Sequence, residues 1–226
     1  MTYHFLLTNT ILSLLLTLAH AVDKTRDPET NAFLKLAATN IDRYTKLDNN
    51  VAWTFDFPSQ STYTFSPGSV VNANAATFPA LTGIGMTMAM LNLGPCAMLP
   101  PHAHQRGTNI VVAISGNTTS YMVGENGVGV VKVELVTGVL TVFPVGSLHS
   151  MQNNGCDNAQ LVSALNSEDT GTINYINAMY QLPPDLLRAA FGDEFLDADG
   201  SASRIPKVGT GSVMGSYECR KRCGLV

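Results

Sequence analysis

The sequence is poor in charged side chains, which make up 13% of its 226 residues, against about a quarter in average proteins. Thirteen basic and 17 acidic residues leave a formal net charge of −4. Apart from Arg220-Lys221-Arg222 there is no basic stripe, so we expect no nucleic-acid partner. Because 45% of the residues are apolar, the scarcity of charge does not indicate a disordered chain.

The sequence also lacks an apolar run of transmembrane length. The longest run, from Phe5 to Leu18, is short for a bilayer and ends in Ala19-His20-Ala21, a pattern typical of signal-peptide cleavage sites. We interpret residues 1–21 as a signal peptide, with an N-terminal membrane anchor as the alternative. The mature chain would begin near Val22 and make no membrane contact. It would enter the secretory pathway and be secreted or held in vesicles or a vacuole.

Cysteine is scarce, with only four residues, Cys96, Cys156, Cys219 and Cys223. An even number in an oxidising compartment predicts two disulfides, for which three pairings are possible. Cys219 and Cys223 could instead form half a metal site, but no histidine lies near them. We favour pairing each of these two with Cys96 or Cys156, because long loops restrict the unfolded chain most. The competing arrangement joins Cys96 to Cys156 and Cys219 to Cys223.

Glycine, proline and asparagine divide the chain into short segments. We predict an N-terminal helical extension over residues 22–50, a barrel with a closing helix over 51–192, and a Gly/Ser-rich tail over 193–226. That tail is expected to be poorly ordered unless its cysteines hold it. A glycosylation sequon at Asn117 follows Gly116 in a turn. Eight short runs read as strands of a sandwich or barrel: 53–57, 85–93, 109–114, 119–123, 129–136, 141–143, 159–166 and 172–179.

Only three of the five histidines would remain after removal of the signal peptide, namely His102, His104 and His149. His102 and His104 alternate along a β-prone segment, so their side chains share one face. His149 follows a Pro-Val-Gly turn at the start of another such segment. Three imidazoles on neighbouring strands predict a first-row metal site with open positions. The alternative is three unrelated polar residues on a barrel.

Two motifs around these histidines resemble those of germin- and spherulin-like proteins, single-domain cupins of the secreted fungal kind. The first spans residues 94–116 and includes Pro-Pro-His-Ala-His-Gln-Arg-Gly-Thr-Asn at 100–109; the second spans residues 144–153. The resemblance covers roughly residues 38–192. It implies a mainly β fold, a cupin jelly-roll β-barrel with short flanking helices at both ends. It also implies a homodimer, to which residues 188–191 and the segment before Trp53 would contribute.

The resemblance further implies a ligand that this chain lacks. Germins with oxidase activity hold manganese with three histidines and one glutamate, and the position of that glutamate is Asn109. A neutral amide is a weaker ligand for a hard cation than a carboxylate. We therefore expect either one divalent transition metal on His102, His104 and His149 or no cofactor. Without a metal, the imidazoles would act as hydrogen-bond donors and general acids.

Strand alternation predicts further side chains that face the histidines and bind a substrate. Ordinary barrel core is the alternative reading for the methionines among them, which could otherwise form an adaptable apolar wall. These candidate residues are Met86, Met88, Met90, Val111, Met151 and Asn153.

Together these features predict a small-molecule protein of the secretory pathway. With His102, His104, His149 and Asn109 as catalytic residues, an apolar cup suits a bulky organic substrate and a non-oxidative cyclisation. The resemblance associates hetero-Diels–Alder cyclisation with recruited fungal cupins of natural-product biosynthesis. One alternative is a metal-dependent germin-like oxidase, dioxygenase or dismutase. Another is a non-catalytic spherulin-like structural or storage protein.

Overall fold

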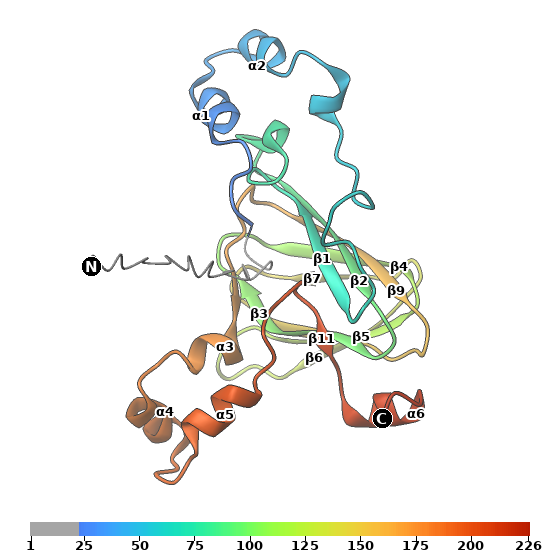
Figure 1. Cartoon of the computed structure of the whole chain (residues 1–226), viewed down its shortest axis with the longest axis vertical. Coiled ribbons are helices and arrows are strands. Elements are labelled where there is room, and N and C mark those ends of the chain that lie inside the picture. Colours follow the sequence, from blue (N-terminus) through green and yellow to red (C-terminus); the bar gives the residue numbers. More distant parts are fainter. Residues whose placement is uncertain (1–22) are drawn as a thin grey trace, which may run out of the picture.

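The computed structural model describes residues 23–226, so the predicted signal peptide lies outside the described residues. Two antiparallel sheets face each other to form a barrel (Figure 1). The first sheet has the order β1 (Gly68–Ala73), β2 (Thr87–Leu93), β9 (Ala159–Leu165), β4 (Asn109–Ser115) and β7 (Leu140–Phe143). The second has the order β10 (Thr172–Asn174), β3 (Ala97–His104), β8 (Leu148–Asn153), β5 (Asn117–Val123) and β6 (Val131–Val136), and β11 (Val213–Met214) also pairs with β3.

The core of the barrel lies between the two sheets. Alternate residues of β9 are buried, and the same period of two recurs in β2, β4 and β8. Leu91 and Leu161 of the first sheet and Leu99 and Met151 of the second belong to one apolar cluster. The predicted mainly β cupin barrel with short helices is therefore confirmed.

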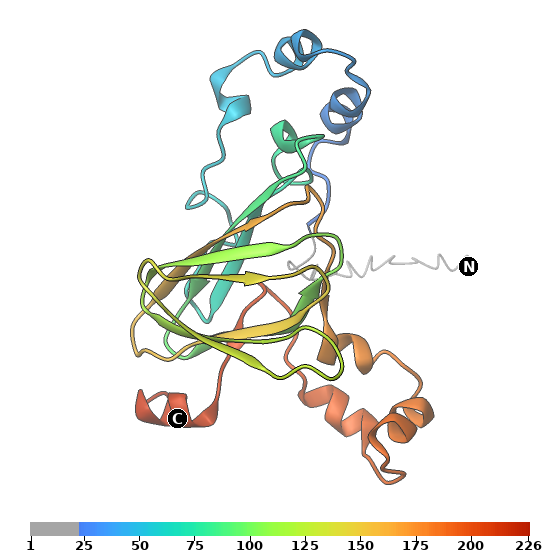
Figure 2. The ribbon, with the colours of Figure 1, turned by 180° about the vertical axis from the view of Figure 1, so that it is seen from behind.

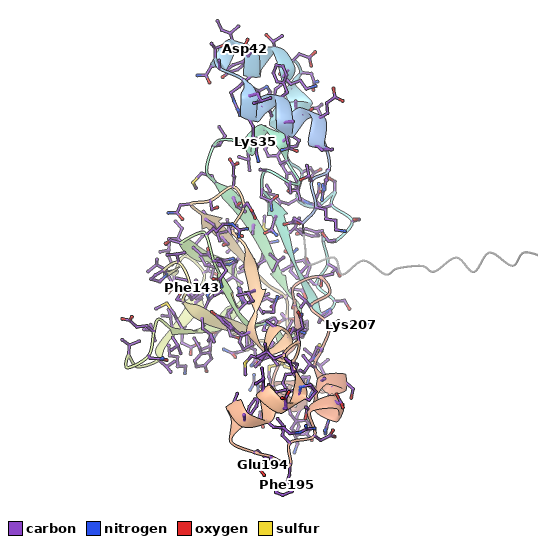
Figure 3. The ribbon with its side chains drawn as sticks, turned by 90° about the vertical axis from the view of Figure 1, so that its left-hand side faces the viewer. Lys35, Asp42, Phe143, Glu194, Phe195 and Lys207 are labelled. Atoms are coloured by element: carbon purple, nitrogen blue, oxygen red, sulfur yellow. A yellow bond between two sulfur atoms is a disulfide. The ribbon has the colours of Figure 1, made fainter. Side chains whose placement is uncertain are left out.

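The helices lie outside the barrel, above and below it in the views of Figures 1 and 2. The N-terminal group, above the barrel, comprises α1 (Pro28–Leu36), α2 (Asn40–Lys46) and the 3₁₀ turns η1 (Asn50–Trp53) and η2 (Pro79–Leu81). Below it lie α3 (Tyr175–Met179), α4 (Pro184–Phe191) and α5 (Ala198–Arg204) on one side and α6 (Tyr217–Arg222) on the other. In Figure 3, Asp42 marks the N-terminal group and Phe195 the opposite end. No helix among residues 23–226 is long and apolar enough to cross a membrane.

Local signals explain where several helices begin and end. The Thr39 side chain accepts a hydrogen bond from the Asp42 amide at the start of α2. The helical extension expected over residues 22–50 is therefore divided between two separate helices. Gly192, in the left-handed conformation, ends α4 as expected. The strand expected at 53–57 is wrong, because η1 and extended chain occupy this region. The run expected over 172–179 is β10 followed by α3.

Two disulfides fasten the C-terminal segment to the barrel. Cys96 is bonded to Cys219 and Cys156 to Cys223, with Cα–Cα distances of 5.7 and 5.3 Å. The favoured pairing of tail with barrel is confirmed, and the alternative pairing through Cys96–Cys156 is wrong. Thus held, the tail forms α5, β11 and α6.

Candidate functional site

Strand register brings the three predicted histidines together on the inner face of the second sheet. His102 of β3 lies directly opposite His149 of β8, and His104 follows two residues later on the same face. Ring centroids are 4.2 Å apart for His102 and His149, 5.3 Å for His102 and His104, and 5.4 Å for His104 and His149. One ring nitrogen from each lies within 4.8 Å of the others. The expected convergence of the imidazoles is thus confirmed.

Backbone carbonyls orient two of the three rings. His102 Nδ1 lies 2.8 Å from the Pro100 carbonyl and His149 Nδ1 lies 2.9 Å from the Ser147 carbonyl. A carbonyl only accepts hydrogen bonds, so each Nδ1 carries the proton and each Nε2 keeps its lone pair. The Nε2 of His149 is buried and has no hydrogen-bond partner within residues 23–226. Metal-binding histidines show this arrangement, in which a carbonyl fixes the nitrogen that does not bind the ion.

A hydroxyl from the edge strand β10 contacts the third ring. Thr172 lies opposite His104 in the register, and its Oγ1 is 3.0 Å from His104 Nδ1. Thr172 was not among the predicted site residues, because the sequence pattern did not show which strand would pair with β3. Its contact limits the rotation of the His104 ring.

Burial keeps the imidazoles neutral. Loss of hydration, reinforced by the charge of His102, lowers the pKa of His104 to about 3. Desolvation and the same neighbour lower the pKa of His149 to about 2. Desolvation also lowers the pKa of His102, against the opposing hydrogen bond to Pro100. At neutral pH the ring lone pairs are therefore free of protons.

Phe143 of β7 forms a wall behind His149. The two rings are stacked, with centroids 4.1 Å apart and planes inclined by 12°. Only 1% of the His149 surface is exposed, so this ring is held from both sides. The sequence predicts a strand that includes Phe143 but no role for this residue in the site, although Phe143 directly precedes the second motif.

Asn109 faces the same cavity as His102 and His104, but its oxygen is occupied. Asn109 Oδ1 accepts a hydrogen bond from the hydroxyl of Ser163 on the neighbouring strand β9. The predicted inward face of Asn109 is confirmed. The site therefore combines three imidazole nitrogens with an amide whose oxygen already has a donor.

The cavity beside the imidazoles is small, with a volume of about 70 Å³. Its apolar walls come from both sheets, and the C-terminal segment adds Val208, Thr210 and Gly211. No charged side chain of the described residues lines it. A ligand in this cavity would therefore meet the imidazoles, a few amides and hydroxyls, and otherwise hydrocarbon.

The predicted methionine wall is wrong. Met86 and Met88 are exposed, and Met90 shares the outward face of β2 with Met88. The inward residues of this strand include Ala89 and Leu91, which line the cavity. Both alternating sets of β2 are apolar, so the sequence could not show which set faces inward.

The three other residues predicted to bind a substrate lie in three different environments. Met151 lines the cavity as expected, two residues beyond His149 on the same face. Val111 faces inward but belongs to the apolar core. The fully buried Asn153 donates its amide hydrogens to the carbonyls of Gly94 and Asp157, at 2.8 and 2.7 Å. Asn153 therefore holds two turns together and is not available to a substrate.

The remaining predicted positions concern modification. Asn117, the predicted glycosylation acceptor, is exposed at the start of β5. All four cysteines are disulfide-bonded, so Cys219 and Cys223 do not form half a metal site.

Fold and site together define a small double-sheet barrel with a three-histidine cluster inside. The chain belongs to the cupin family, whose model matches residues 55–194. It is 28% identical to spherulin-1A of Physarum polycephalum over 201 residues, covering 88% of this chain and 80% of that protein. It is 30% identical to germin-like protein 4-1 of Oryza sativa subsp. japonica, covering 58% and 56% of the two chains.

A solved oxalate oxidase shares the fold, with a TM-score of 0.62 and 22% identity over 68% of this chain and 80% of that one. The resemblance to germin- and spherulin-like cupins is thereby confirmed. At this identity the solved structure supports the fold alone.

Proposed function

We propose that His102, His104 and His149 hold one divalent first-row transition metal and that the chain uses it to transform a small oxygen-donor substrate. The observation that carries the proposal is the buried, unpartnered Nε2 of His149 beside two further imidazoles. A buried polar atom without a partner costs about 1–3 kcal/mol, which a ligand at this point would recover. The neutral imidazole set fits an ion of intermediate softness, such as zinc, copper or iron.

The residues of this chain perform three tasks in the proposed site. The carbonyls of Pro100 and Ser147 and the hydroxyl of Thr172 orient the rings. Phe143 and the apolar walls restrict water near His149. The Asn109 amide can donate a hydrogen bond to an oxygen of the substrate, because Ser163 occupies its own oxygen. When bound, the metal supplies Lewis acidity and, if redox-active, electron transfer.

The cavity favours a substrate of few atoms. Pockets for drug-sized ligands measure roughly 300–1,000 Å³, whereas this one measures about 70 Å³. Three neutral imidazoles also leave the full charge of a divalent ion uncompensated, which favours an anionic ligand such as a small carboxylate or hydroxy acid. The cyclisation of a bulky substrate, expected from the sequence, has less support, because the methionines face outward and the larger adjoining cavity of about 400 Å³ is lined by Asn72, Thr170 and Thr172 but by none of the three histidines.

Metal analysis of the full secreted chain tests the proposal. We expect close to one transition-metal ion per chain when chelators are avoided, and loss of that ion in His149→Ala. Met151→Leu is the matched control, because it lies on the same face two residues away and keeps its volume. A wild-type chain that neither contains nor takes up manganese, iron, cobalt, nickel, copper or zinc would refute the proposal.

The same preparation separates catalysis from storage. We expect chelator-sensitive loss of at least one member of a panel of small carboxylic and hydroxy acids, measured as disappearance of the acid with dioxygen present. Stoichiometric metal without turnover on this panel would favour the non-catalytic alternative that the spherulin relatives suggest.

A further inference from the structure

A second cavity adjoins the histidine cavity. It has a volume of about 400 Å³, and Asn72, Thr170 and Thr172 line both cavities. The rest of its wall comes mainly from α1 and the residues before it, the turn after β1, and the loop between β9 and β10. Thr172, whose hydroxyl contacts His104, therefore lies at the boundary between the two spaces. We call the larger cavity the vestibule.

The vestibule is polar, whereas apolar side chains from both sheets form much of the histidine cavity. Five charged side chains line the vestibule, and its other lining residues are polar or glycine except for Ala75 and Ala76. A hydrocarbon ligand would therefore find almost no apolar contact in it. The charged residues are Asp23, Lys35 (labelled in Figure 3), Arg106, Glu168 and Asp169.

Two of the three carboxylates in the vestibule are held in position by neighbouring side chains. One oxygen of Asp23 accepts hydrogen bonds from the amides of Asn72 and Asn74, at 2.7 and 2.8 Å, and its other oxygen has no partner within residues 23–226. Asp169 forms an ion pair with Arg106 at 2.7 Å. A ligand therefore meets acceptors that need little ordering when it binds.

Other polar groups of the vestibule have no partner in the part of the chain that the structure describes. No side-chain hydrogen bond or ion pair there engages the hydroxyls of Thr25 and Thr170 or the ammonium of Lys35. Asn31 is only 8% exposed, and its amide oxygen is buried without a hydrogen-bond partner among the same residues. Buried polar atoms usually have a partner. This wall therefore combines unused donors with an acceptor that lacks a donor.

We propose that the vestibule binds the hydroxylated tail of a sugar acid whose carboxylate end enters the histidine cavity. For that carboxylate end, the assignment rests on the proposed function. Hydroxyl groups both donate and accept hydrogen bonds, so they suit a wall that presents amide and carboxylate acceptors beside threonine and lysine donors. The histidine cavity then admits only the reacting end of the ligand, and the vestibule, at about 400 Å³, has the volume of an ordinary ligand pocket.

Two other kinds of tail fit the vestibule less well. An apolar tail would displace water from its polar groups without replacing the lost hydrogen bonds. A tail with a second carboxylate would add negative charge to a wall that already has three carboxylates and two cations. An uncharged, hydroxylated tail avoids both costs.

A series of six-carbon 2-hydroxy acids tests the assignment, because all its members present the same end to the histidines. The probes are gluconate, 2-hydroxyhexanoate, 2-hydroxyadipate and 6-amino-2-hydroxyhexanoate, titrated calorimetrically into the metal-loaded full chain. We expect gluconate to bind at least about tenfold more tightly than 2-hydroxyhexanoate, because only gluconate pairs with the polar wall. Equal affinities for these two, or tightest binding of the dicarboxylate or the amino acid, would overturn the proposal.

A substitution in the vestibule tests the same point from the protein side. Thr25→Val/Lys35→Met removes two unused donors, so the affinity for gluconate should fall about tenfold. Affinity for 2-hydroxyhexanoate and the metal content should not change. Lys24→Met is the control, because Lys24 is exposed nearby and does not line the vestibule. Wild-type affinity for gluconate in the double variant would refute the assignment.

Repeating the series with chelator-treated protein separates this inference from the proposed function. Without metal, both gluconate and 2-hydroxyhexanoate should bind more weakly, but the preference for gluconate should persist because it arises in the vestibule. Ligand-observed NMR measures the two affinities in competition. A chain that takes up no metal would refute the proposed function and still allow this preference to be measured. A metal-loaded chain without the preference would refute the vestibule assignment alone.

Discussion

At the scale of single residues, each of the three imidazole rings is oriented by a contact to one of its nitrogens, and these contacts are of two kinds. His102 and His149 are oriented by backbone carbonyls, whereas His104 depends on the side chain of Thr172. A substitution can remove the Thr172 support without changing the backbone. His104 is therefore the histidine whose positioning can be tested most directly.

Thr172→Val should weaken metal binding while leaving the three imidazoles in place. Valine keeps the shape of threonine but cannot hydrogen-bond to His104 Nδ1, and loss of such a support typically costs 10–100-fold in metal affinity. Titration with zinc or cobalt would measure the change. Thr170→Val is the control, because Thr170 lines the same cavity and makes no side-chain hydrogen bond within the described residues. If Thr172→Val and Thr170→Val bind the metal with equal affinity, the contact of Thr172 with His104 does not contribute to metal binding.

Asn109→Glu should raise the affinity for manganese. The carboxylate adds an anionic oxygen to a set of neutral ligands, and Ser163 remains able to donate a hydrogen bond to its second oxygen. Asn109→Gln supplies the added length without charge. In a manganese titration followed by thermal shift, the Asn109→Glu variant should therefore bind manganese more tightly than Asn109→Gln and wild type. A glutamate variant that binds no more manganese than the glutamine variant would mean that position 109 does not reach the ion.

The sequence predicts contacts between residues that are close along the chain better than contacts between residues on different strands. His102 and His104 could be placed on one face because the strand period fixes neighbours two residues apart. The supports from Phe143, Ser163 and Thr172 come from other strands. Register between strands decides such contacts, and one sequence does not determine that register.

At the scale of elements, residues 208–212 form a strap across the barrel opening. The Thr210 carbonyl accepts a hydrogen bond from Val70 N of β1 at 2.9 Å, and Ser212 Oγ donates to the Met98 carbonyl of β3 at 3.2 Å. The strap therefore joins β1, at the edge of the first sheet, to β3 of the second sheet and contributes to the wall of the histidine cavity. The sequence predicted that the cysteines could hold the tail. It did not predict α5 and α6, since composition alone indicated disorder.

Removal of the Cys156–Cys223 disulfide should destabilise the fold and expose the cavity. On the chain-entropy model, a bond across 67 residues contributes about 4 kcal/mol. We expect urea unfolding of the Cys156→Ser/Cys223→Ser double variant to show a loss of that order. The described residues contain only three histidines, so carbethoxylation mapped to the peptides of His102, His104 and His149 reports this site and should proceed faster in the metal-free variant.

A control variant separates the strap from general weakening of the fold. Leu161→Ala creates a cavity in the barrel core at a cost of about 2–5 kcal/mol, similar to the disulfide. If both variants react equally fast with the imidazole reagent, access follows global stability and the strap does not guard the cavity.

At the scale of the whole molecule, the barrel wall separates two sets of side chains. The histidines lie inside on the second sheet, whereas exposed apolar residues such as Met88 and Ile110 lie outside on the first. Both sets were visible in the sequence as alternating residues. Their opposite orientations became clear only when the sheets were assembled, which explains why Met88 and Met90 were expected beside the histidines.

This separation predicts that a charge placed on the outer wall leaves the proposed metal binding unchanged. Ile110→Glu changes a side chain on the outer face of β4, so the variant should keep the metal content and metal-dependent thermal shift of wild type. His149→Ala changes the inner face and should lose the metal. Titration of metal into wild type and Ile110→Glu provides the check, and a tenfold or larger difference in metal affinity would show that the barrel wall transmits a change on its outer face to the histidines.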